Sequence, residues 1–152
     1  MMQEYFSGIK DVKMGEHVKI VHPVNMYGCE VGDGTFVGPF VEIQKNVIIG
    51  KDCKIQSHSF VCELVTIGDN CFIGHGVMFI NDLFSGGGPA MGDITKWRKT
   101  SIGSKVSIGS NATILPVNIC SNTVIGAGAV VTKDIHTPGV YAGNPAKLIK
   151  TL

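Results

Sequence analysis

The side chains that we select as candidates for proton transfer lie between residues 58 and 82. His58, Glu63 and His75 are followed by the adjacent pair Asn81 and Asp82. A histidine or a carboxylate can remove a proton from an attacking group, and an amide can hold that group or stabilise an oxyanion. We therefore regard Asp82 and His75 as candidate bases or orienting groups, and Asn81 as a candidate for holding the reacting atoms.

Each of these residues also has a purely structural interpretation. His58 could be a hydrogen-bonded member of a regular surface ladder. Asn81 and Asp82 follow Ile80, and their side chains could start a turn by bonding to their own backbone. The sequence leaves both interpretations open. The remaining histidines are interpreted as structural or exposed: His17, His22 and His136.

The composition describes one domain with one hydrophobic core, because the chain has 152 residues, 44% of them hydrophobic and 16% charged. A formal charge of +1 argues against a nucleic-acid-binding protein, which would carry a basic face. No apolar run approaches the roughly 18 residues of a membrane helix, and the N-terminus lacks a signal-peptide layout, so we expect a cytoplasmic protein. The five cysteines form no CxxC pair, which favours a reducing compartment without a disulfide framework.

A six-residue repeat organises the chain and must position the candidate groups. Every sixth residue from Val31 is aliphatic until the last, which is aromatic: Val31, Val37, Ile43, Ile49, Ile55, Val61, Ile67, Ile73 and Phe79. A helix of 3.6 residues per turn would not keep this stripe on one face. A second stripe of small or β-branched residues, from Thr35 to Val77, follows each aliphatic residue by four. The repeat extends back to Val12 and resumes from Ile102 to Val131.

Glycines and cysteines occupy fixed places in this repeat. Glycine often follows the aliphatic residue directly, where we expect a corner that needs its conformational freedom: Gly32, Gly38, Gly50, Gly68 and Gly74. Cys29, Cys53 and Cys71 lie on the stripe of small residues, so we interpret them as core fillers.

The repeat resembles the hexapeptide-repeat family, whose fold is a left-handed parallel β-helix. The resemblance implies an all-β protein in which three six-residue sides form one triangular coil of 18 residues, with about six coils. It divides the single domain, 1–152, into four parts: coils over 12–79, an inserted loop over 80–101, coils over 102–135 and a short C-terminal capping tail over 136–152. On such a coil His58 and His75, about one coil apart, fall nearly above one another.

Two C-terminal motifs, GAGAVVTKD at 126–134 and AGNPAK at 142–147, resemble the acyltransferases of this family. The resemblance implies acetyl-CoA as co-substrate, no metal, and a homotrimer with active sites between neighbouring subunits. Small residues would let the pantetheine arm lie close to the backbone, and lysines could meet the phosphates. The coenzyme A contacts implied are Gly109, Ala127, Gly128, Lys133 and Lys147.

A narrower resemblance lies in the motifs VEIQ, KIQSHSFVCE and GHGVMFIND. They are similar to the nucleotide-sugar N-acetyltransferases, which acetylate an amino sugar carried on UDP or dTDP for surface polysaccharides such as lipopolysaccharide. This implies catalytic roles for Asn81, Asp82 and His75 and substrate-binding roles for Gln44, His58 and Glu63. The long loop, with Trp97, would close over the site. The next motif reads LFSGGG where many relatives have a proline and an arginine, so the nucleotide sugar stays open.

Three other functions remain open. The γ-class carbonic anhydrases share this fold and bind zinc through three histidines, but their five-residue pair comes second, whereas here His17 and His22 precede His58. O-acetyltransferases of free sugars usually begin with a helical segment, and this repeat starts near Val12. A non-catalytic trimeric scaffold would leave the long loop without a purpose.

Overall fold

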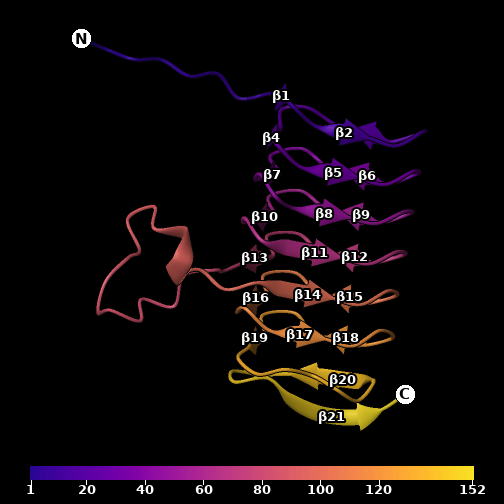
Figure 1. Cartoon of the computed structure of the whole chain (residues 1–152). Coiled ribbons are helices and arrows are strands. Elements are labelled where there is room, and N and C mark those ends of the chain that lie inside the picture. Colours follow the sequence, from indigo (N-terminus) through magenta and orange to yellow (C-terminus); the bar gives the residue numbers. More distant parts are fainter.

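The computed structural model describes residues 1–152 and shows a left-handed parallel β-helix built from three sheets (Figure 1). The first sheet, here sheet A, holds β1 (Ile9–Lys10), β4 (Asn25–Tyr27), β7 (Glu42–Ile43), β10 (Phe60–Val61), β13 (Met78–Phe79), β16 (Thr113–Ile114) and β19 (Val130–Val131). Sheet B holds β2 (Lys13–Met14), β5 (Glu30–Val31), β8 (Ile48–Ile49), β11 (Val65–Ile67), β14 (Thr100–Ile102) and β17 (Asn118–Ile119). Sheet C holds β3 (Lys19–Ile20), β6 (Phe36–Val37), β9 (Lys54–Ile55), β12 (Phe72–Ile73), β15 (Ser107–Ile108), β18 (Val124–Ile125), β20 (Gly139–Ala142) and β21 (Lys147–Thr151).

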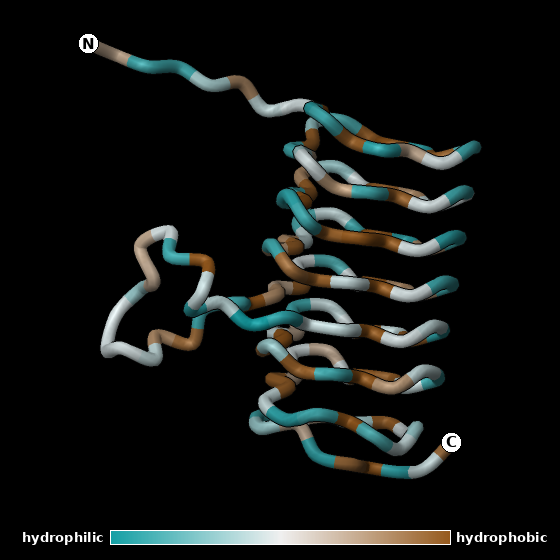
Figure 2. Tube along the Cα trace, viewed as in Figure 1, coloured by the Kyte–Doolittle hydropathy of each residue, from teal (hydrophilic) through white to brown (hydrophobic).

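The two stripes of the repeat form the core of this prism. Ile43, Val61, Phe79 and Ile114 face inward one above the other in sheet A, and the small residues fill the space beside the corners. Figure 2 shows hydrophobic segments recurring at the same place in successive coils. The cysteines on the small stripe are buried and form no disulfide, which confirms their interpretation as core fillers: Cys29, Cys53 and Cys71. Stacked aliphatic side chains therefore hold the coils together.

Two details of the sequence prediction are wrong. The helix has about seven coils rather than six, because a first strand forms at Ile9 and pairs with β4. The predicted glycine corners do not use positive φ angles. The left-handed backbone occurs three residues after the inward aliphatic, as at Asn46. Gly32 is required instead because a Cβ there would lie 2.6 Å from the carbonyl carbon of Gly50 in the next coil.

The regular coil is interrupted once and ends in a hairpin. After β13 the chain leaves the prism and forms the one-turn helix η1 (Ile94–Lys96). It returns to the prism at β14, which pairs with β11 in the regular parallel register (Figure 1). At the C-terminal end β20 and β21 form an antiparallel pair, and β20 continues sheet C below β18. With η1 at three residues, the structure contains no helix that could cross a bilayer.

Candidate active site

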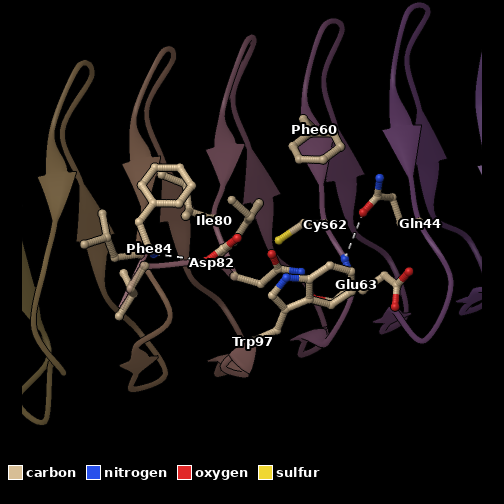
Figure 3. Close-up of a pocket in the computed structure, with 12 residues that line it drawn as sticks. Gln44, Phe60, Cys62, Glu63, Ile80, Asp82, Phe84 and Trp97 are labelled. Atoms are coloured by element: carbon tan, nitrogen blue, oxygen red, sulfur yellow. Dashed lines mark hydrogen bonds between the residues drawn. The ribbon is translucent and has the colours of Figure 1, made fainter. Parts of the chain in front are cut away.

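The largest pocket, about 560 Å³, lies between the outer face of sheet A and the inserted loop (Figure 3). Twelve residues line it: Gln44, Phe60, Cys62, Glu63, Phe79, Ile80, Asn81, Asp82, Leu83, Phe84, Trp97 and Leu115. Four of the six residues predicted to be catalytic or substrate-binding are among them: Gln44, Glu63, Asn81 and Asp82. The pocket therefore brings together predicted residues that are up to 38 positions apart in the sequence.

The alternation of inward and outward side chains along each strand determines where the pocket residues point. Gln44, Cys62, Ile80 and Leu115 each follow an inward residue of sheet A, so their side chains point outward in one column. Glu63 and the pair Asn81–Asp82 come next, at the corner where the chain turns from sheet A toward sheet B. The loop begins at this corner and supplies the opposite wall.

The carboxylate of Asp82 holds the loop in place. Its Oδ1 accepts a hydrogen bond from the backbone N–H of Phe84 at 3.0 Å, and its Oδ2 accepts one from Ala90 at 2.7 Å. Bonds from N–H groups to an ionised oxygen are among the stronger ones in proteins. The turn interpretation of Asp82 therefore has a direct structural basis, and both of its oxygens are engaged.

Asn81 and Gln44 are held by hydrogen bonds across the coils. The Asn81 amide nitrogen donates to the carbonyl oxygen of Glu63 at 3.2 Å. The Gln44 amide donates to Glu42 at 3.0 Å and accepts a bond from the backbone N–H of Glu63 at 3.3 Å. Burial, and then the charges of Glu42 and Glu63, raise the pKa of the nearby Tyr27 hydroxyl. The N-terminal end of the pocket is thus polar and preorganised.

Glu63 is the only buried carboxylate of the chain, with 8% of its surface exposed. Its nearest cation is the half-exposed Lys45, whose Nζ lies 3.7 Å from Oε1. A buried charge with one distant partner is costly unless a ligand or a partner compensates it. The position of Glu63 in the wall of the pocket suits a ligand that carries an amine.

Cys62 also lines the pocket, but its thiol is not a nucleophile at neutral pH. Burial raises the pKa of Cys62 to about 12. Because the thiolate is the reactive form, this side chain contributes only apolar surface.

The two histidines lie outside the pocket. His58 and His75 are exposed at the corner between sheets C and A. The two histidines share this corner, one coil apart and offset by one residue. The ring of His58 stacks on Phe40 of the previous coil, with centroids 4.9 Å apart, while Gly76 occupies the equivalent corner position of the next coil.

Three of the residues predicted to contact coenzyme A share this corner with His75: Gly109, Ala127 and Gly128. Two have structural reasons to be glycine. A Cβ at Gly109 would lie 2.4 Å from the backbone nitrogen of Ala127, and Gly128 has a φ of +67°. Exposed Lys147 pairs with Ala142 beside the same corner, whereas exposed Lys133 follows β19 at the other edge of sheet A.

Sequence reasoning missed the apolar lining of the pocket. Phe60, Ile80 and Leu115 occupy outward positions of sheet A, and Leu83 and Phe84 come from the loop. Apolar residues at the outward positions of successive strands were the signal available in the sequence. No three His, Cys, Asp or Glu side chains gather within this chain in a way that could hold a metal ion.

Comparisons with known proteins agree with this architecture. A 30%-identical relative, the bifunctional protein GlmU of Streptococcus uberis, matches 93% of this chain and 32% of its own length. The chain spans between about a quarter and a third of the length of the curated relatives it matches. A perosamine N-acetyltransferase mutant from Caulobacter crescentus, solved with CoA and GDP-perosamine, is 22% identical, with a TM-score of 0.65 over 94% of this chain and 57% of that one. A mutant of the N-acyltransferase AntD from Bacillus cereus, solved with dTDP and coenzyme A, is 23% identical, with a TM-score of 0.78 over 91% of this chain and 82% of that one.

Two family models match the repeats themselves. The "bacterial transferase hexapeptide (six repeats)" model matches residues 28–63. The "hexapeptide repeat of succinyl-transferase" model matches residues 64–79 and 99–133, on either side of the inserted loop. Together the models cover more than half of the sequence, and the three sheets contain the coils that they describe. The chain belongs to the hexapeptide-repeat family of bacterial transferases.

Proposed function

We propose that this protein is an acyltransferase that moves an acetyl group from acetyl-CoA to the amine of an amino-deoxy sugar linked to a nucleotide. The observation that carries the proposal is the pocket under the loop, where Gln44, Glu63 and Asn81 converge. Membership of a transferase family supports group transfer. Structures of the same fold bind coenzyme A together with a nucleotide or a nucleotide sugar, which supports this substrate class.

The polar end of the pocket would hold the sugar amine. Glu63 offers a buried negative charge, and Gln44 and Asn81 are fixed beside it by hydrogen bonds. Only the unprotonated amine can attack a thioester, so the site must remove or redistribute its proton. The amine nitrogen bonds to the carbonyl carbon, the carbon–sulfur bond breaks, and coenzyme A leaves as a thiolate. With an ordinary thiol pKa of about 8.5, that thiolate can accept the amine proton itself.

The role of Asp82 in this scheme is to position the loop. Both of its oxygens accept bonds from loop N–H groups, so it keeps Phe84 over the pocket rather than removing a proton. His75 would then be the candidate base or orienting group, and it lies at the corner that carries the predicted coenzyme A contacts.

A homotrimer would join the two halves of the site. Within one chain the His75 corner and the pocket lie at opposite edges of sheet A. If the corner of one subunit faces the pocket of its neighbour, the thioester and the amine meet between subunits. Closed cyclic symmetry is the usual form of such assemblies. Analytical ultracentrifugation would give a trimer mass if this arrangement is correct, and a monomer that turns over substrate would contradict it.

The decisive experiment measures thiol release from acetyl-CoA with UDP-, dTDP- and GDP-linked 3-amino and 4-amino sugars, and with free galactosides as comparison. Turnover with one nucleotide amino sugar is the expected result. Turnover with a free sugar alone would replace N-acetylation by O-acetylation. No turnover, together with no coenzyme A binding in calorimetry, would refute acyl transfer.

A further inference from the structure

The pocket is polar at one end and apolar at the other. In Figure 3, Gln44 and Glu63 lie beside the earlier coils, whereas Ile80 and Phe84 lie toward the later coils. The outward column of sheet A follows the same order, because Gln44 is succeeded by Cys62, Ile80 and Leu115 in successive coils. A ligand that fills the whole pocket must therefore be amphipathic along the prism axis.

The polar groups of the pocket are mostly satisfied by the protein itself. Asp82 bonds to two loop N–H groups, the Asn81 amide nitrogen bonds to the Glu63 carbonyl, and Gln44 bonds to Glu42 and to the Glu63 backbone. A fully hydroxylated ligand in the apolar end would leave hydroxyl groups without partners, at a free-energy cost for each. The apolar end suits a hydrocarbon group instead.

The apolar end also lies at the level where the acyl donor is expected. Leu115 follows β16, and Gly109, the first predicted coenzyme A contact, lies in the same coil just before that strand. In a trimer with parallel prisms this level is the same in each subunit. The acyl group would then enter the pocket from the C-terminal side, while the amine is held at the N-terminal side.

We infer that the pocket accepts acyl groups longer than acetyl, with the added methylenes packed between Phe84, Leu115 and Ile80. The inference rests on the proposed acyl transfer and extends it to a further donor class, straight-chain acyl-CoA thioesters of about four carbons. The chemistry is unchanged. The amine nitrogen bonds to the acyl carbon, the carbon–sulfur bond breaks, and the amine proton ends on the thiol of free coenzyme A.

Binding of coenzyme A thioesters tests this without any acceptor. Calorimetry would compare acetyl-, butyryl- and hexanoyl-CoA on the wild-type protein. Burial of one methylene is worth about a fourfold change in affinity, so butyryl-CoA is expected to bind about 15-fold more tightly than acetyl-CoA. An affinity that does not rise from acetyl to butyryl overturns the inference.

Variants in the loop locate the effect. Phe84→Ala should reduce the ratio of butyryl-CoA to acetyl-CoA affinity at least twofold, because it removes one wall of the apolar end. Met91→Ala is the matched control, since Met91 is an exposed apolar residue of the same loop that does not line the pocket, and it should leave the ratio unchanged. If Phe84→Ala and Met91→Ala have the same ratio of butyryl-CoA to acetyl-CoA affinity, the assignment of this pocket to the acyl chain is wrong.

Kinetics separate this inference from the proposed function. With an accepted amino sugar, kcat/KM should rise from acetyl-CoA to butyryl-CoA by about the same factor as affinity. Turnover that is fastest with acetyl-CoA would refute the longer acyl chain and leave N-acetylation standing. If no amino sugar is turned over, the proposed acceptor is wrong, and the binding series with Phe84→Ala still decides whether the pocket holds the acyl chain.

Discussion

Replacing Asp82 with alanine separates the two roles that its carboxylate could have. The substitution removes two hydrogen bonds, to the backbone N–H groups of Phe84 and Ala90. Bonds to charged groups contribute about 1.5–3 kcal/mol each, and the lower value applies to a half-exposed side chain. We therefore expect loop opening to become easier by about 3 kcal/mol, or about 100-fold in its equilibrium. Global stability should change by less than about 1 kcal/mol, because Ala90 is the only buried residue between 80 and 99 and it lies outside the main core.

Hydrogen exchange measured by mass spectrometry gives a direct readout of this opening. The peptide that contains Ala90 should exchange about 100-fold faster in Asp82→Ala, and the loss of activity should come from the weakened pocket wall. Asp93→Asn is the control, because Asp93 caps η1 through Thr95 and should alter exchange only around that turn. If loop exchange is unchanged while kcat falls 10² to 10⁴-fold, as removal of a general base predicts, Asp82 is the base and the loop-holding role is wrong.

Three further predictions follow from the packing. Ile73→Ala leaves a cavity at a fully buried position and should lower the free energy of unfolding, measured in urea, by about 2–5 kcal/mol. A smaller loss would mean that the coils relax into the cavity. Gly128→Ala should cost about 1–2 kcal/mol because of its positive φ and should also weaken coenzyme A binding, whereas unchanged affinity would show that the glycine serves the turn and does not touch the ligand. Cys62→Ala should retain acyl transfer within about tenfold in steady-state assays, because the buried thiol stays protonated, and a trapped acyl-cysteine in the wild type would disprove this.

The fold could be predicted because each coil repeats the same local information. The inward aliphatic residues, such as Ile43 and Ile67, recur every six positions, and no other regular structure buries such a stripe. The interruption after Phe79 was visible for the same reason, since both stripes stop there. The N-terminal end of the prism was harder to predict. β1 lies in the first coil, where the residues are exposed and need not follow the repeat.

The site was only partly predictable. Gln44, Glu63 and Asn81 could be selected by resemblance, and they do line one pocket. The histidines do lie at one corner in successive coils, but the sequence could not show what their rings contact. His58 stacks on Phe40 of the previous coil, and Gly76 takes the equivalent position in the next coil.

The sequence by itself determined the coil, the inward stripe and the position of the inserted loop, because these depend on short-range periodicity. Only the tertiary structure decided which outward residues share a surface and what their polar atoms bond to. The 18-residue coil sets the stacking, but the path of the loop sets the pocket, and that path depends on Asp82 reaching the backbone of Ala90. Such contacts follow from the three-dimensional path of an irregular segment, for which the repeat contains no information.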